Sequence, residues 1–202
     1  TSFVNTGKVT ISGNSAKWDV GALQGANGLE FINNRGGVLI ENNSVDGVAG
    51  AMLLYYKDAV FSADQGDIIV KGNTEKRGGA NPILNSLVFG TNGSASMDSV
   101  VLRAQEGRTV TFYDPFRNEG DGVEYDNIVY DFNKSEGVDT TPYNGKAPEF
   151  TGTIRFSGAE ADKLITQAAG ETEADWQNRL AESKYFNVSG KTTLYDGTLI
   201  LE

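Results

Sequence analysis

A unit of about 29 residues repeats along the first half of the chain, and it constrains the fold more than any other feature of the sequence. Its first marker is the string apolar-x-Gly/Asn-Asn-Ser/Thr, in which the asparagine stands at positions Asn14, Asn43 and Asn73. These asparagines follow one another at intervals of 29 and 30 residues. A repeat at such constant spacing is typical of architectures in which similar units stack on one another.

Two further markers keep the same phase. A Gly-Ala pair follows each string, at 21–22, 50–51 and 79–80. An aromatic residue comes next, with Asn or Asp three residues beyond it, which gives the pairs Phe31/Asn34, Phe61/Asp64 and Phe89/Asn92. We therefore predict units at 9–36, 38–66 and 68–96. After an insertion of about 14 residues, a fourth unit places Phe112 and Phe132 at the positions of Ile11 and Phe31.

Within each unit the apolar residues alternate, which is typical of strands and not of helices. The alternating segments are 9–11, 38–40, 68–70 and 110–112, and Gly/Asn turn residues follow the first three. A strand this short buries its apolar face only by pairing with its equivalent one unit later. The sequence therefore predicts an all-β fold, a three-sided parallel β-helix with coils of about 29 residues. Leucine-rich repeats lack a match to their Leu/Asn spacing here, and helical repeats require a period of 3.6.

The markers then acquire structural roles. Asparagine tolerates left-handed backbone and, stacked in register, forms ladders of side-chain amides. Gly-Ala fits a sharp corner because it adds little bulk. We expect Phe31, Phe61 and Phe89 to stack inside the coil as an aromatic column.

The second half of the chain is less regular. Residues 117–150 read as loops on either side of a strand at 128–132, and 153–156 as a strand that returns to the stack. A capping box from Ser157 to Glu160 then predicts a helix with an apolar stripe, Leu164, Ile165 and Ala168. A second helix is predicted at 172–183, with Trp176 and Leu180 on one face.

These readings divide the chain into β-helix coils at 1–157 with a loop insertion at 117–150, a helical excursion at 158–184 and a final coil at 185–202. Neither end shows a polar cap of the kind that closes a stack of repeats. The chain therefore reads as a single solenoid domain that is a fragment of a longer chain.

Composition excludes several function classes. The chain has no cysteine and no histidine, which excludes disulfides, thiolate metal sites and Ser-His-Asp chemistry. Its formal net charge of −10 argues against nucleic acid and against an anionic membrane surface as partners. No apolar run is long enough to span a membrane as a helix. We expect no metal and no cofactor.

The repeated wording resembles passenger domains of Gram-negative autotransporters, most closely the polymorphic outer-membrane protein type with its Gly-Gly-Ala-apolar and Phe-x-x-Asn motifs. Segments 31–34 and 89–92 match the second motif, and 61–64 carries Asp in place of Asn. The first motif is degenerate at 36–38, 49–52 and 78–80. Segments 102–115, 152–158 and 195–201 also look like this family.

The resemblance implies a right-handed β-helix on the bacterial surface, held by a separate membrane β-barrel, with no insertion of this segment into the membrane. It implies adhesion or display more often than catalysis, with a host-cell surface, the matrix or a second copy as partner. The family motifs then mark candidate binding residues, which are Phe31, Asn34, Gly79, Ala80, Phe89 and Asn92. Freedom from cysteine suits passage through an outer membrane.

Two other functions stay open. Polysaccharide-active β-helices use paired carboxylates, and the candidates here are Asp114, Asp121, Glu124, Asp126 and Asp131. The acidic loop 119–131 is alternatively a solvated loop or a calcium site, although the spacing from Asp121 to Asp126 does not follow an EF-hand. A purely structural or self-associating stalk is the remaining reading.

Overall fold

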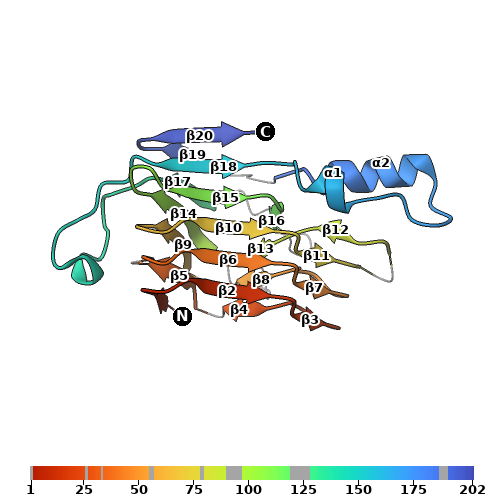
Figure 1. Ribbon diagram of the computed structural model, residues 1–202, viewed down its shortest axis with the longest axis horizontal. Helices are drawn as coiled ribbons and strands as arrows, with labels where there is room; N and C mark the ends of the chain where they lie inside the picture. Colours follow the sequence, from red (N-terminus) through yellow and green to blue (C-terminus); the bar gives the residue numbers. More distant parts are fainter. Residues whose placement is uncertain are drawn as a thin grey trace.

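The fold consists mainly of short strands in parallel sheets. The computed structural model describes residues 2–25, 27–32, 34–54, 57–77, 80–89, 97–118, 128–186 and 191–202. Figure 1 shows the strands as layers, from the N-terminus at one end to the C-terminus at the other. The expectation of an all-β fold of parallel sheets is confirmed.

Two six-stranded sheets run the length of the stack. The first contains, in spatial order, β1 (Ser2–Val4), β5 (Leu29–Ile32), β9 (Lys57–Ala63), β14 (Met97–Ala104), β17 (Val129–Phe132) and β19 (Thr192–Leu194). The second contains β2 (Val9–Ser12), β6 (Val38–Glu41), β10 (Ile68–Lys71), β15 (Thr109–Phe112), β18 (Thr153–Phe156) and β20 (Thr198–Leu201). Every neighbouring pair in both sheets is parallel.

The register of the second sheet follows the sequence repeat. Val9 pairs with Val38, Val38 with Ile68, and Ile68 with Val110. Alternate residues of β6 and β10 are buried, because side chains on a strand point to opposite faces in turn. The predicted pairing of each short strand with its equivalent one unit later is confirmed, and so is the placement of Phe112 and Phe132 in the fourth unit.

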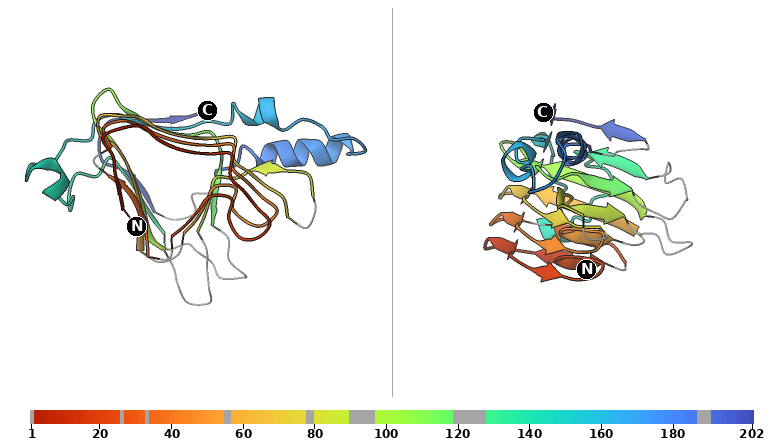
Figure 2. Two further views of the ribbon diagram at one scale, coloured as in Figure 1. Left: turned by 60° about the horizontal axis from the view of Figure 1, so that its bottom comes forward. Right: turned by 90° about the vertical axis from the view of Figure 1, so that its right-hand side faces the viewer.

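The third side of the stack is divided into two four-stranded sheets. One contains β3 (Ser15–Ala16), β7 (Ser44–Val45), β11 (Thr74–Glu75) and β12 (Ile83–Leu84), and the other β4 (Leu23–Gly25), β8 (Met52–Leu54), β13 (Leu87–Phe89) and β16 (Phe116–Asn118). Only β12, among the described strands, pairs antiparallel, because the chain turns back on β11 in a hairpin. Figure 2 shows successive turns of the chain following one three-sided outline.

An aromatic core fills the interior. The Phe31 ring stacks on Phe3 at 4.9 Å between centroids and on Phe61 at 5.6 Å. Phe61 then meets Phe112 edge to face at 5.5 Å. Each such ring buries a large apolar area, and the ring pairs add specific stacking energy.

The prediction that Phe89 continues the column is wrong. Phe61 pairs with Leu102, whereas Phe89 pairs with Leu54 in a different sheet. In the third unit, the residues that stack on the corner at 50–51 are Asn85–Ser86. Ser86 O accepts hydrogen bonds from the backbone N–H groups of Ala51 and Met52. Ala80 is an exposed residue between β11 and β12, and Gly79 lies outside the described residues. The third unit is out of phase because the β11–β12 hairpin adds residues before its corner.

Two helices lie between β18 and β19, α1 (Ala161–Leu164) and α2 (Glu173–Glu182), and a 3₁₀ turn spans Thr141–Tyr143. The second helix is confirmed, with Thr172 accepting a hydrogen bond at its N-cap. The capping box is wrong, because α1 begins after Glu160, whose side chain pairs with Lys163 instead. The predicted stripe also fails, since Leu164 is exposed and only Ile165 is buried.

The irregular segments leave the stack on opposite sides, as Figures 1 and 2 show. We name 157–186 the helical excursion and 133–150 the loop excursion. The strand expected at 128–132 is present as β17, and β16 continues the stack to Asn118, so the predicted insertion at 117–150 begins too early. Neither four-stranded sheet of the third side has a described strand between β18 and β19. The helical excursion occupies this stretch of the chain.

Candidate functional site

A ladder of side-chain amides runs along one corner of the stack, as the repeat predicts. The backbone N–H and the Nδ2 of Asn14 both donate to Oδ1 of Asn43, at 3.1 and 2.8 Å. Asn43 repeats this arrangement on Asn73 with the same two distances. At the next rung both donors of Asn73 meet Oδ2 of Asp114, at 2.8 and 2.7 Å. The first ladder therefore ends on a carboxylate.

A second ladder shows the same ending. The amide of Asn5 donates to Oδ1 of Asn34 at 2.9 Å, and the backbone N–H of Asn34 donates to Oδ2 of Asp64 at 2.8 Å. The other oxygen of Asp64 accepts hydrogen bonds from Ser62, Gln105 and Tyr143. Asp64, which replaces Asn in the second Phe-x-x-Asn segment, is thus buried and hydrogen-bonds both to the stack and, through Tyr143, to the loop excursion.

The carboxyl groups that end the two ladders, those of Asp114 and Asp64, are buried, and their burial raises the pKa of each. Burial raises the pKa of Asp114 to about 7, although the N–H groups of Asn73 and Gly72 oppose the shift by favouring the charged form. Burial also raises the pKa of Asp64 above its usual range, against the hydrogen bonds from Asn34 and Tyr143. Burial lowers the pKa of neighbouring Arg103, whose guanidinium lies over the ring of Phe150.

The loop excursion forms a cleft of about 440 Å³ against the stack. Tyr143 lies on its wall and donates its phenolic hydrogen to Asp64 at 3.0 Å. The other lining residues are Gln105, Glu106, Lys146, Ala147, Pro148, Glu149 and Thr151. The mixed charges of this cleft suit polar contacts, and a phenol anchored 79 residues away in sequence holds the excursion in place.

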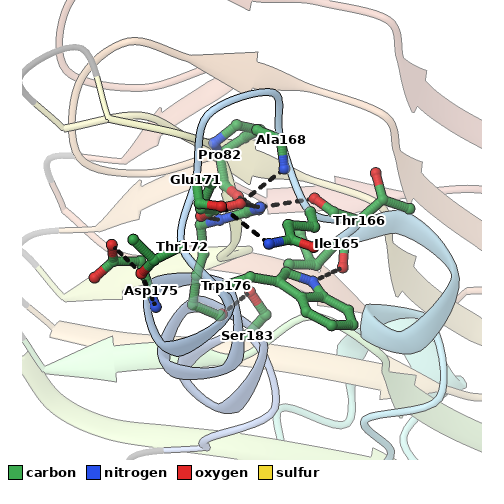
Figure 3. Close-up of polar contacts among 11 residues, drawn as sticks. Pro82, Ile165, Thr166, Ala168, Glu171, Thr172, Asp175, Trp176 and Ser183 are labelled. Atoms are coloured by element: carbon green, nitrogen blue, oxygen red, sulfur yellow. Dashed lines mark hydrogen bonds and ion pairs between the residues drawn. The ribbon is translucent and has the colours of Figure 1, made fainter.

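An arginine on α2 helps to join the helical excursion to the stack. Arg179 makes two bonds to the carboxylate of Glu171, at 2.8 and 2.7 Å. It also donates to the carbonyl oxygens of Pro82, beside β12, and of Thr166, at 2.7 and 2.8 Å. Figure 3 shows Glu171, Pro82 and Thr166 converging on one point. The bidentate contact lowers the pKa of Glu171 to about 2.

Apolar packing supports this anchor. Trp176 and Leu180 pack against Leu84 and Ile165, as their spacing on one helix face predicts. The indole N–H of Trp176 donates to the carbonyl of Ile165 at 2.8 Å (Figure 3). A cleft of about 460 Å³ remains between α2 and the β11–β12 hairpin, and carboxylates, amides and arginines line it. The Glu75–Arg77 pair on its wall lies on the hairpin side, and the Glu171–Arg179 pair lies within the excursion.

The residues of the Phe-x-x-Asn motif lie inside the fold where the structure describes them. Phe31 and Asn34 are both 0% exposed. Phe31 stacks between two rings, and Asn34 donates from Nδ2 to Gly66 O at 2.8 Å and accepts from the Gly37 N–H at 2.8 Å. Both side chains therefore contact other parts of this chain, which leaves them no surface for a partner.

The remaining predicted binding residues are scattered. Ala80 is exposed in the hairpin, and Phe89 stands on β13, where its backbone position alone is described. Gly79 and Asn92 lie outside the described residues. The four predicted residues that the structure describes therefore do not form one site.

The described carboxylates among those proposed for polysaccharide chemistry have different structural roles. Asp114 is fully buried at the end of the first ladder, and Asp131 is paired with Lys134 at 2.9 Å. Asp121, Glu124 and Asp126 lie outside the described residues, as does most of the acidic loop considered for calcium. Within the described ranges no group of three or more acidic residues is placed to hold a metal ion.

Sequence reasoning missed the anchors of both excursions. Arg179 had a visible signal, because it lies three residues after Trp176 on the helix that packs against the stack, where a charge is unusual unless paired. The contact between Tyr143 and Asp64 had none, since it joins distant segments across irregular loops. No helix among the described residues has the length and apolar character needed to cross a membrane.

Comparison with known proteins gives one informative match. The chain is 30% identical over 142 residues, which is 70% of its length, to a protein of Chlamydia pneumoniae named "Probable outer membrane protein pmp2". The match spans 14% of that protein. No protein-family model matches the chain. No solved structure matches it significantly.

Proposed function

We propose that the chain is a segment of an autotransporter passenger that is displayed on the surface of a Gram-negative bacterium and acts in adhesion or display. In this proposal the parallel sheets form a right-handed, three-sided β-helix, and the helical excursion is an outgrowth of a single domain. The similarity to an outer membrane protein over 70% of the chain carries the proposal.

The stacked architecture supports binding through an extended surface. Each coil adds a strand to sheets that run the full length of the chain, and both excursions project from the sides of this scaffold. Loops positioned by a rigid scaffold are common sites of recognition. Of the carboxylates considered for polysaccharide chemistry, Asp114 by contrast ends a ladder and Asp131 pairs with Lys134, which favours binding over catalysis.

Surface display is tested by producing the chain as the passenger of an autotransporter translocation unit in a Gram-negative host. We expect antibody labelling of intact cells and removal of the label by external protease. A passenger that stays inaccessible until the cells are lysed, while an established passenger in the same unit is labelled, would contradict the display proposal.

Adhesion is tested with beads that carry the purified chain. We expect these beads to bind cultured epithelial cells or extracellular matrix more than beads carrying a denatured sample do. Shortening 133–150 or 157–186 in separate variants, with circular dichroism to check the sheets, shows which excursion contributes. Equal binding of folded and denatured beads would contradict adhesion, and turnover of a polysaccharide by the purified chain would contradict a non-catalytic role.

A further inference from the structure

One corner of the stack carries a groove of about 350 Å³ that is lined mainly by polar side chains. Ser15, Ser44 and Thr74 stand in register along it, on β3, β7 and β11. Adjacent parallel strands lie about 4.8 Å apart, so the hydroxyls form a regular row along the stack. Within the described residues, none of these hydroxyls is hydrogen-bonded to another group of the chain.

A row of charges borders the hydroxyls. Lys17, Asp46 and Lys76 follow β3, β7 and β11 at equivalent positions and line the groove. None of the three forms an ion pair with a described residue. The groove therefore offers alternating donors and acceptors, with a local excess of one positive charge in a chain whose net charge is −10.

An exposed indole lies beside the groove, against its lining residue Lys17. Trp18 is 72% exposed, and the ammonium group of Lys17 lies 5.2 Å from the centre of its ring. The following residue, Asp19, has φ of 61°. In the next coil Gly47 packs so closely that an added Cβ would meet the Asp19 backbone N at 2.7 Å. The second unit therefore has no side chain at Gly47, next to the backbone of Trp18 and Asp19.

We propose that this surface, which we call the corner groove, binds an extended saccharide chain. Lys17, Asp46, Lys76 and the hydroxyl row Ser15, Ser44 and Thr74 line it, and Trp18 lies beside it against Lys17.

The chemistry of the groove fits a saccharide better than a peptide. A pyranose ring presents a C–H face that packs on an indole and hydroxyl groups that both donate and accept. Each hydroxyl can therefore pair with Asp46, a lysine or a protein hydroxyl. An apolar peptide side chain would find only the indole, because the other exposed groups of the groove are polar. The period of the hydroxyl row is close to the length of one sugar unit in an extended chain.

This inference deepens the proposed adhesive function by naming the ligand class, and it is tested on purified protein without cells. The probe is an oligosaccharide array that carries neutral, uronic-acid and sulfated chains. Trp18→Ala removes the platform at an exposed position, so the fold is retained. Tyr185→Ala is the matched control, because Tyr185 is an aromatic residue 65% exposed outside the groove.

We expect the chain to bind at least one class of oligosaccharide, with a tenfold or greater loss in Trp18→Ala and none in Tyr185→Ala. Ser44→Ala combined with Thr74→Val should weaken binding of the same ligands. A preference for acidic chains that disappears in Lys17→Gln/Lys76→Gln identifies the charge of the ligand, and a preference for neutral chains is equally consistent with the proposal. Absence of binding to every class, or unchanged binding by Trp18→Ala, overturns the saccharide site and leaves surface display standing.

Discussion

The first amide ladder and the helical excursion are attached to the same scaffold in opposite ways. In the ladder the same two donors meet an oxygen of the next rung at each step, so the stabilisation is spread over Asn14, Asn43, Asn73 and Asp114. In the excursion, Arg179 donates to one group of the stack, the carbonyl oxygen of Pro82, while its bonds to Glu171 and Thr166 lie within the excursion. The hydroxyl of Ser183, which accepts from the Leu84 N–H, and the packing of Trp176 and Leu180 complete the attachment. A substitution in the ladder removes one rung of several, whereas a substitution of Arg179 removes a contact with the stack together with two contacts that hold the excursion itself.

The comparison predicts that a core substitution lowers the unfolding free energy of the whole stack. Phe61→Ala should cost about 3–5 kcal/mol of unfolding free energy, because it leaves a cavity in a fully buried aromatic column. Urea denaturation followed by circular dichroism measures the loss. Tyr185→Ala at an exposed position serves as the control and should change stability little. A loss below 1 kcal/mol for Phe61→Ala would mean that the coils do not share one cooperative core.

The carboxylate that ends the first ladder should make stability depend on pH. The pKa of folded Asp114, about 7, lies above its ordinary value of 3.8, so the folded chain holds this proton more tightly than the unfolded chain. Its contribution is fully present below pH 3.8 and is lost as the pH rises through 7, by up to about 4 kcal/mol at 1.36 kcal/mol per pKa unit.

Denaturation midpoints of wild type and Asp114→Asn, measured from pH 4 to pH 8.5, test this dependence. The difference between the two chains isolates Asp114 from Asp64, whose raised pKa acts in the same direction. We expect the wild-type stability to fall more steeply across pH 7. Parallel profiles would show that the N–H donors around Asp114 outweigh its burial.

A break in the middle of the ladder should cost less than a break in the core. Asn43→Ala removes the acceptor of Asn14 and the side-chain donor to Asn73, and we expect a loss of about 1–3 kcal/mol because buried polar groups are left unpaired. Asn14→Ala, at the exposed end of the ladder, should cost less. Thermal or urea unfolding of both variants gives the ranking, and the reverse order would refute a cooperative ladder.

The smallest effect on the stack is expected from the excursion anchor. Arg179→Leu should speed hydrogen exchange of the α2 amides roughly tenfold or more, since hydrogen bonds to charged groups are worth about 1.5–3 kcal/mol each. Exchange in β6 should stay unchanged. Arg179→Lys keeps the charge without the bidentate fork and should fall in between. Equal acceleration in α2 and β6 would show that the excursion and the stack unfold as one unit.

The sequence was most informative where a residue type recurs at the spacing of the coil. The positions of β2, β6, β10 and β15, the amide ladder and the aromatic pair Phe31/Phe61 all follow from that recurrence. The phase of the third unit did not, because the Gly-Ala motif at 79–80 imitates a corner that the chain forms later, at Asn85–Ser86. A hairpin insertion cannot be told from a normal coil when its residues happen to keep the repeat spacing.

The candidate sites were less predictable than the fold. Phe31 and Asn34 belong to a motif that recurs because it builds the interior, so recurrence by itself pointed to buried positions. The corner groove instead depends on small residues in register and on an indole that appears once, at Trp18. No period in the sequence marks such a residue.

The sequence by itself determined that this chain forms short parallel strands in stacked units, because alternating apolar residues and turn-forming Gly and Asn at constant spacing admit few other ways to bury a strand. Only the tertiary structure decided which residues end the ladders, where the third corner lies and how the excursions are held. Those outcomes rest on contacts such as Tyr143 with Asp64 and Arg179 with Pro82, between residues 79 and 97 positions apart. Contacts of that range follow from how the coils are packed and leave no local pattern in the chain.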